Sequence, residues 1–363
     1  MRRQKLLIDA CTRTLTRQIK NGELNQEYNN YIEEVCESAI RGRELELYIE
    51  ECRDEGQLIT PEEIECALEH WSQWLKWSTV ILDENDYLEV AVHALNIAPI
   101  LRGTDYGTSR QRDLGQLWTD TIRGFLGEKA FQKWVKRAFN VSIELDYRRG
   151  SLEEYLPTDI KYVITSDGIK REPKIRISIK TTKIRGIWLD IPYAQIGHSD
   201  VFVLVKVGVE REHFLAFLKK ISVIKDKFLK KAIERGFIDE ADVEKLWKSL
   251  PDFEPIPAYI AGYFDKRNYI NEVSSRKAII EVDGEMKRTR FIINKYIGYW
   301  KQNDDNFKNK ILEILKQKYN NIPDNVKIEF EAIGGFSSAL RFLVNSGSLK
   351  RKREDWQMLI KEI

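Results

Sequence analysis

The sequence predicts an α/β (α+β) protein with a central sheet flanked by helices and preceded by a helical N-terminal domain. Apolar residues recur at helical spacing through residues 1–100. Between 158 and 207 the pattern changes to period-two alternation and then to a nearly continuous apolar run, which is typical of strands. A chain of 363 residues has room for two or three domains. We therefore expect a helical domain at 1–110, a core at 111–265 and an α+β region at 266–363.

The charge balance excludes a protein that is basic throughout. Lys and Arg number 59 and Asp and Glu 57, for a net charge of +2, so any nucleic-acid surface has to be local. No apolar run approaches the ~18 residues that mark a membrane span, and the basic start MRRQK lacks the apolar stretch of a secretory signal. We expect a cytoplasmic protein without a membrane partner.

The four cysteines lie within the first 66 residues, at 11, 36, 52 and 66. Their spacing matches no zinc-binding pattern. We expect thiols buried in helical cores.

Residues 60–63 predict the N-terminus of a helix. Thr60 is an N-cap residue, Pro61 suits the first helical position, and Glu63 completes a capping box. The helix that follows is rich in tryptophan, at positions 71, 74 and 77. We interpret these rings as helix-packing core, with base stacking as the alternative.

A second break is expected at Ala98-Pro99 and in the Gly-, Ser-, Thr- and Arg-rich stretch 101–112. This stretch is either a loop that contacts phosphates or a linker with solvated arginines.

We expect the catalytic residues in the segment from 124 to 180. Apolar residues recur at helical spacing from Gly124 to Ala138, and Glu128 lies beside them. Residues 158–164 and 175–179 alternate and flank a turn at 166–168, which predicts a hairpin. Asp159 would then lie near Ser178 and Lys180, on a polar face opposite the isoleucines. Two carboxylates and a lysine at one point suit a hard divalent cation that activates water on a phosphodiester.

This order of residues resembles the PD-(D/E)XK nuclease superfamily, the fold of many restriction endonucleases. The matching stretches are GFLGEKAF around Glu128, LPTDIKYV around Asp159 and ISIKTT around Lys180, and together with the segments between them they cover about a quarter of the chain. The resemblance implies a restriction-endonuclease-like mixed central sheet. It differs at two points: Pro157 lies two residues before Asp159, and Ser178 replaces the expected acid.

The resemblance also implies roles for the residues. Asp159 and Glu128 would hold Mg²⁺, or Mn²⁺ in its place, and Lys180 would position or activate water. Gln195, in AQIGHSD, would contact substrate or water.

The implied function is a metal-dependent endonuclease of the restriction type, acting on double-stranded DNA. The alternatives are a structure-specific repair or recombination nuclease and a catalytically silent nucleic-acid-binding protein that lost its acid at Ser178. The oligomeric state is left open, a homodimer included.

Later segments complete the expected fold. Residues 201–207 read as a buried central strand, and 215–250 as helices with a lysine-rich face that is either solvated or follows a phosphate backbone. Residues 279–292 predict a hairpin around Asp283-Gly284. The cluster 350–353, KRKR, is either a phosphate contact or a solvated end.

Overall fold

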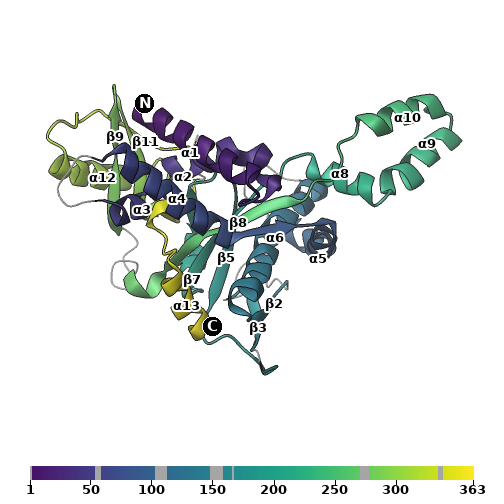
Figure 1. The fold of residues 1–363 in the computed structure, drawn as a ribbon, viewed down its shortest axis with the longest axis horizontal. Helices are drawn as coiled ribbons and strands as arrows, with labels where there is room; N and C mark the ends of the chain where they lie inside the picture. Colours follow the sequence, from purple (N-terminus) through teal and green to yellow (C-terminus); the bar gives the residue numbers. More distant parts are fainter. Residues whose placement is uncertain are drawn as a thin grey trace.

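The computed structural model describes residues 2–53, 59–102, 113–147, 158–165, 167–269, 278–333 and 338–363. It is a mixed α/β structure with mixed sheets, as the sequence predicts (Figure 1). In its described part, every helix is too short or too polar to span a membrane.

The N-terminal region is helical with one exception. Its helices are α1 (Arg2–Lys20), η1 (Gln26–Tyr31), α2 (Ile32–Arg41), α3 (Glu46–Glu51), α4 (Pro61–Ser78) and α5 (Glu84–Arg102). The exception is the short apolar strand β1 (Thr79–Leu82), which pairs antiparallel with β8 (Ile256–Asp265). Because α5 continues through Pro99, the predicted break at Ala98-Pro99 is wrong. The stretch 103–112 lies outside the described residues.

Helix α4 begins where the sequence predicts. The Thr60 side chain accepts from the backbone N–H of Glu63, and the Glu63 carboxylate accepts from the backbone N–H of Thr60. This capping box satisfies two N–H groups that the helix itself leaves open. Trp71 and Trp74 are buried, which confirms their interpretation as core.

The central sheet has the strand order β1-β8-β7-β5. Strand β7 (Val201–Val207) is buried along its whole length, as predicted. It runs parallel to β5 (Ile177–Lys183) and antiparallel to β8. One face of this sheet is covered by α6 (Leu114–Phe139), which contacts β5, β7 and β8.

The predicted hairpin is wrong in its second strand. The chain turns after β3 (Ile160–Ile164), where Thr165 N–H donates to the carbonyl of Ile169, and returns as the short β4 (Lys170–Arg171). Strands β2 (Ser142–Leu145), β3 and β4 form an antiparallel sheet of their own. β5 pairs with β7 instead, because that apolar strand offers it a fully buried partner.

A further sheet is built from the C-terminal region and one earlier strand. Its members are β6 (Trp188–Pro192), β9 (Ile279–Lys287), β10 (Arg290–Trp300), β11 (Lys327–Phe330) and β12 (Arg341–Asn345), and α12 (Asp305–Lys318) packs against β9. The β9–β10 hairpin is confirmed, but its turn lies at Arg288-Thr289, where Arg288 has a positive φ of 57°. Asp283 and Gly284 lie inside β9, so the predicted turn position is wrong.

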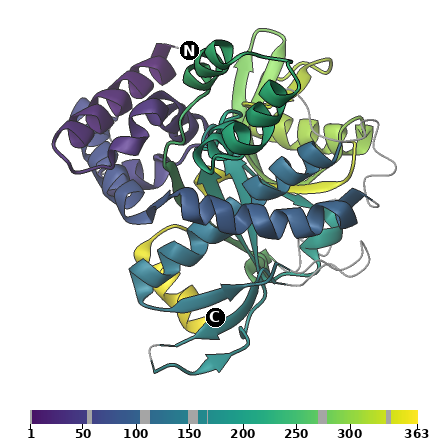
Figure 2. The same ribbon diagram turned by 90° about the vertical axis from the view of Figure 1, so that its right-hand side faces the viewer.

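A helical arm connects β7 to β8 and projects from the body of the protein (Figure 1), and it faces the viewer in Figure 2. It consists of α8 (His213–Lys220), the π-helical η2 (Ile224–Leu229), α9 (Lys230–Glu234) and α10 (Glu240–Ser249), as the helical pattern of 215–250 predicts. The remaining elements are α7 (Tyr193–Ile196), η3 (Lys266–Tyr269), η4 (Ser346–Ser348) and α13 (Arg353–Glu362).

Hydrophobic cores cross the expected domain boundaries. One core joins side chains from α5, α6, the central sheet and the C-terminal helix α13. Another joins α1, α2 and α4 to the other face of the sheet and to β12. The three predicted parts therefore share cores, and their boundaries at 110 and 265 stay predictions.

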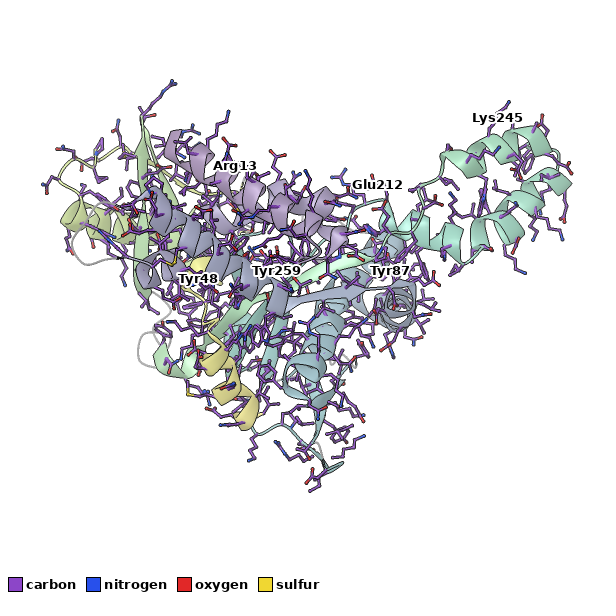
Figure 3. All side chains as sticks on the ribbon, viewed as in Figure 1. Arg13, Tyr48, Tyr87, Glu212, Lys245 and Tyr259 are labelled. Carbon is purple, nitrogen blue, oxygen red and sulfur yellow. A yellow bond between two sulfur atoms is a disulfide. The ribbon has the colours of Figure 1, made fainter. Side chains whose placement is uncertain are left out.

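A fully buried ion network ties the N-terminal helices to the sheet and the C-terminal segment. Lys206 of β7 donates to Glu44 at 2.6 Å, and Arg351 lies 3.8 Å from the same carboxylate and donates to the Glu44 carbonyl at 3.1 Å. Burial raises the pKa of Glu44, but the charges of Lys206 and Arg351 outweigh burial and hold the pKa below its ordinary value. The Lys206 ammonium lies over the ring of Tyr259, 5.6 Å from the ring centroid. Figure 3 labels Tyr259 near the centre of the molecule.

This network corrects the interpretation of the basic cluster at 350–353. Arg351 is 1% exposed, so it neither contacts phosphate nor ends in solvent. Lys352 forms an ion pair with Glu51 at 2.6 Å.

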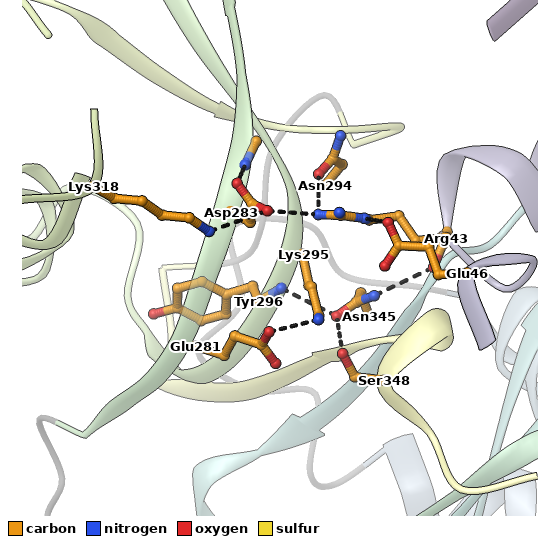
Figure 4. A network of polar contacts seen from close by, with 12 residues as sticks. Arg43, Glu46, Glu281, Asp283, Asn294, Lys295, Tyr296, Lys318, Asn345 and Ser348 are labelled. Carbon is orange, nitrogen blue, oxygen red and sulfur yellow. Dashed lines mark hydrogen bonds and ion pairs between the residues drawn. The ribbon is translucent and has the colours of Figure 1, made fainter. Parts of the chain in front are cut away.

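A second polar network joins the segment between α2 and α3 to the C-terminal sheet (Figure 4). Asp283 of β9 accepts from Arg43 at 3.1 Å and lies 3.2 Å from Lys318 of α12, and the Tyr319 hydroxyl also donates to it. Burial raises the pKa of Asp283, but these donors outweigh burial and bring the pKa to about 2. The carboxylate therefore stays charged where three segments meet.

We expect Glu44→Gln to lower the free energy of unfolding by about 3–5 kcal/mol, because it leaves Lys206 and Arg351 buried without their counter-charge. Glu50→Gln, at an exposed position six residues on, should change it by less than about 0.5 kcal/mol. Urea denaturation of both variants measures the difference. Equal stability of the two variants would show that the network contributes nothing.

We expect Asp283 to make the free energy of unfolding depend on pH in the acidic range. Its pKa is depressed in the folded state, so its contribution is complete above the unfolded value near 4 and is lost as the pH falls through about 2. Wild type should exceed Asp283→Asn by about 2 kcal/mol at neutral pH, and the gap should close towards pH 2. Asp226→Asn, on the exposed arm, is the control. A gap that is constant with pH would contradict the assignment.

Candidate active site

Helix α6 approaches β5 closely because Gly127, which has no side chain, faces the strand. The Thr181 hydroxyl of β5 donates to the carbonyl of Gly124 at 2.8 Å. A Cβ atom on Gly127 would overlap the Thr181 side chain, whereas one on Gly124 would meet nothing within 4 Å. The helix–strand contact that places Glu128 therefore depends on Gly127.

Glu128 follows Gly127 on α6 and is half-buried, with one carboxylate oxygen shielded from solvent. It lies near Tyr147, whose pKa is raised first by burial and then by the charge of Glu128. Since α6 packs on the Thr181 face of β5, and neighbouring side chains of a strand alternate, Lys180 leaves β5 on the opposite face.

Asp159 is fixed to the free edge of β5. Its backbone N–H donates to the carbonyl of Ile177 at 2.8 Å, and its carboxylate accepts from the backbone N–H of Ile179 at 2.5 Å. These bonds join the residue that precedes β3 to β5, at the residues on either side of Ser178. The predicted proximity of Asp159 to the 178–180 tripeptide is present, although the two strands do not form a hairpin.

Lys180 and Gln195 are in direct contact. The ammonium of Lys180 donates to the side-chain carbonyl of Gln195 at 2.6 Å. Gln195 lies on the short helix α7, which follows β6 directly and precedes β7. The two residues that the sequence assigns to positioning water or substrate thus hold each other in place.

Ser178 lies on the same face of β5 as Lys180 but is buried, with 7% of its surface exposed. Its neighbour across the parallel pair is Phe202, and that of Lys180 is Leu204. Both belong to the second hydrophobic core, whereas Ile177 and Ile179 belong to the first. The predicted alternation holds, but the face expected to be polar is mixed.

Asp190 is a residue to which the sequence reasoning gave no role. It lies in the middle of β6, where Arg341 of β12 binds one carboxylate oxygen. Among the described residues, its buried Oδ1 has no hydrogen-bond partner. Burial raises its pKa, against the opposing charges of Arg341 and Lys180. The sequence did contain a signal for this residue, because an aspartate interrupts the apolar strand WLDIP. Burying a carboxylate there costs free energy unless the charge has a partner.

The groups gathered around Lys180 are its ammonium, the Gln195 amide and the Asp190 carboxylate, one oxygen of which has no hydrogen-bond partner among the described residues. Asp159 adds a second carboxylate at the edge of β5. Asp159 and Asp190 have the hard oxygen atoms that Mg²⁺ prefers. Lys180 interacts electrostatically with Asp190 and contacts Gln195. The ligand pair Asp159 and Glu128 stays a prediction.

Comparisons with protein-family models, with curated proteins and with solved structures find no match to this chain. The fold and the site therefore rest on the geometry described above.

The contact between α6 and β5 can be tested with two glycines of one helix. Gly127→Ala should lower the free energy of unfolding by about 1–3 kcal/mol, because the added methyl group overpacks Thr181. Gly124→Ala should raise it by about 0.5–1 kcal/mol, since alanine favours the helix and finds open space there. Chemical denaturation measures both, and the same sign for both would contradict this packing.

Proposed function

We propose that the protein is a Mg²⁺-dependent endonuclease that hydrolyses phosphodiester bonds in double-stranded DNA, with Mn²⁺ able to replace Mg²⁺. The observation that carries the proposal is Asp159 bonded to β5 beside Lys180, which itself contacts Gln195. A divalent cation held there would lower the pKa of a bound water and shield the phosphate.

The order of elements supports a restriction-endonuclease-like fold for this core. A helix with Glu128 is followed by the antiparallel strands β2, β3 and β4, then by β5 with Lys180, and, after β6 in the C-terminal sheet, by a short helix and a strand parallel to β5. This is the order that the sequence resemblance implies. We place the protein in the cytoplasm as part of the same proposal.

Asp190 extends the proposed metal set. The acid that the resemblance leads one to expect at Ser178 is missing, and a serine hydroxyl supplies no charge. The charge of Lys180 acts to lower the pKa of Asp190, and Oδ1 of Asp190 has no hydrogen-bond partner among the described residues. We assign Asp190 the missing negative charge on the Lys180 face of β5, with Asp159 at the edge of the strand as the principal ligand. Glu128 approaches this edge from the opposite face, where α6 packs, and keeps the accessory role that the sequence predicts.

The helical arm is the proposed DNA contact outside the core. Lys227, Lys230 and Lys231 are exposed on it, so their ammonium groups are available to phosphates. Lys219 and Lys225 are used inside the arm, where they pair with Asp252 and Glu244. The arm's exposed lysines give a local basic surface on a chain that is nearly neutral overall.

A catalytically silent DNA-binding protein is the second candidate, and the burial of Ser178 favours it. A buried serine at the position of the second acid leaves fewer carboxylates for the metal. Such a protein would bind DNA through the arm without cutting it.

Plasmid cleavage separates the two functions. Wild type should cut supercoiled plasmid when Mg²⁺ is added and lose this activity with a chelator. Asp159→Asn keeps an oxygen that accepts from Ile179 but removes the charge, so cleavage should fall more than about 100-fold, a loss typical of one electrostatic group. DNA binding, measured by mobility shift, should be retained.

Glu172→Gln, an exposed acid between β4 and β5, is the matched control and should cut like wild type. Discrete fragments favour a restriction enzyme, and smearing favours a structure-specific or nonspecific nuclease. A mobility shift with intact plasmid would replace the nuclease by the silent binding protein. Undiminished cutting by Asp159→Asn would overturn the site.

A further inference from the structure

Cys52, Cys66 and His70 form a cluster outside the candidate active site. The two sulfur atoms are joined as a disulfide, and the Cys52 sulfur lies 3.7 Å from His70 Nδ1. The three ligand atoms all lie within 4.8 Å of one another. The expectation of core thiols holds for Cys11 and Cys36, which are buried and free, and is wrong for Cys52 and Cys66.

Local structure presents the three side chains at one point. Cys66 and His70 are four residues apart on α4, so they share one face of this helix. Cys52 caps the end of α3, where its N–H donates to the carbonyl of Tyr48 at 3.0 Å. Helices α3 and α4 pack against each other, so the approach of Cys52 does not depend on the disulfide alone.

The donor set has the chemistry of a soft divalent metal site. Two thiolates and one imidazole are the ligands of Zn²⁺, which binds sulfur at about 2.3 Å and nitrogen at about 2.0 Å in a tetrahedron. Ligand atoms of such a tetrahedron are separated by about 3.5–3.8 Å. The observed separation of Cys52 Sγ and His70 Nδ1 lies in this range. Mg²⁺ prefers oxygen ligands, so this cluster is unrelated to the proposed nuclease metal.

We propose that the reduced protein binds one Zn²⁺ through Cys52, Cys66 and His70, with an open fourth position, and that the disulfide is the metal-free state of the same site. A dithiol reductant breaks the Sγ–Sγ bond by passing two electrons and two protons to the pair, and itself becomes a disulfide. Zn²⁺ then displaces the two thiol protons and binds the thiolates.

The position of the cluster suits this exchange. His70 is exposed and both cysteines are half-buried, so a reductant and an ion can reach them. In a reducing compartment the pair is expected as thiols rather than as a disulfide. Bound Zn²⁺ would then replace the covalent link between the end of α3 and α4.

Metal binding to the full-length chain tests the proposal. Protein reduced by a phosphine under inert gas is titrated with Zn²⁺ against a chromophoric chelator, and Co²⁺ is used to record thiolate-to-metal charge transfer. We expect one ion per chain in the reduced protein and none in the oxidised one. His70→Ala should weaken binding by more than about 100-fold, beyond the loss for an outer-shell partner, and should weaken the tetrahedral Co²⁺ spectrum.

Two controls make the result specific. His93→Ala removes a histidine on α5 and should bind like wild type. The double variant Cys52→Ser with Cys66→Ser keeps the buried Cys11 and Cys36 and should bind no Zn²⁺ in this competition. The proposal is overturned if reduced wild type takes up no Zn²⁺, or if either the double variant or His70→Ala binds as tightly as wild type.

Discussion

The buried contact between Glu44 and Lys206 is the constraint on which the arrangement of this protein depends. Lys206 lies on β7, a strand of the central sheet that is buried along its whole length, and is 0% exposed, as is Glu44. Neither charge can be left alone in such a place, because desolvation of an unpaired ion costs several kcal/mol. The segment after α2 and the segment after η4, which carries Arg351, must therefore both pack against β7.

The candidate active site depends on this arrangement. β7 holds β5 in parallel register, so the position of Ser178 and Lys180 follows from that of Phe202 and Leu204. The chain then leaves β5 through a tight turn, enters the C-terminal sheet as β6 and returns through α7. This path brings Gln195 into contact with Lys180 and Asp190 within the range of its charge. The central sheet thus supplies Lys180, the C-terminal sheet supplies Asp190 and α7 supplies Gln195, whereas Asp159 comes from the segment that precedes β3.

The Cys52–Cys66–His70 cluster and the Asp283 network show the same principle at the periphery. The cysteine cluster joins α3 to α4, which pack against each other, and the Asp283 network joins the segment after α2 to the C-terminal sheet. Asp283 is 240 residues away from Arg43 in the chain, yet the two are 3.1 Å apart. These polar contacts complete interfaces that hydrophobic packing has already formed.

The sequence by itself determined the local elements: the capping box at Thr60, the buried tryptophans of α4, the buried strand β7 and the alternation at 177–180. Each of these follows from the spacing or type of neighbouring residues, because the backbone geometry of a helix or a strand sets which neighbours share one face. The tertiary structure decided which strand β5 pairs with, the burial of Arg351 in a stretch that reads as a basic tail, the joining of Cys52 to Cys66, and the presence of Asp190 near Lys180. The burial of Arg351 depends on residues far away in the chain, and the other three features depend on how the elements that carry them pack. Burial and charge pairing fix these contacts, and the spacing of neighbouring residues does not specify the partners.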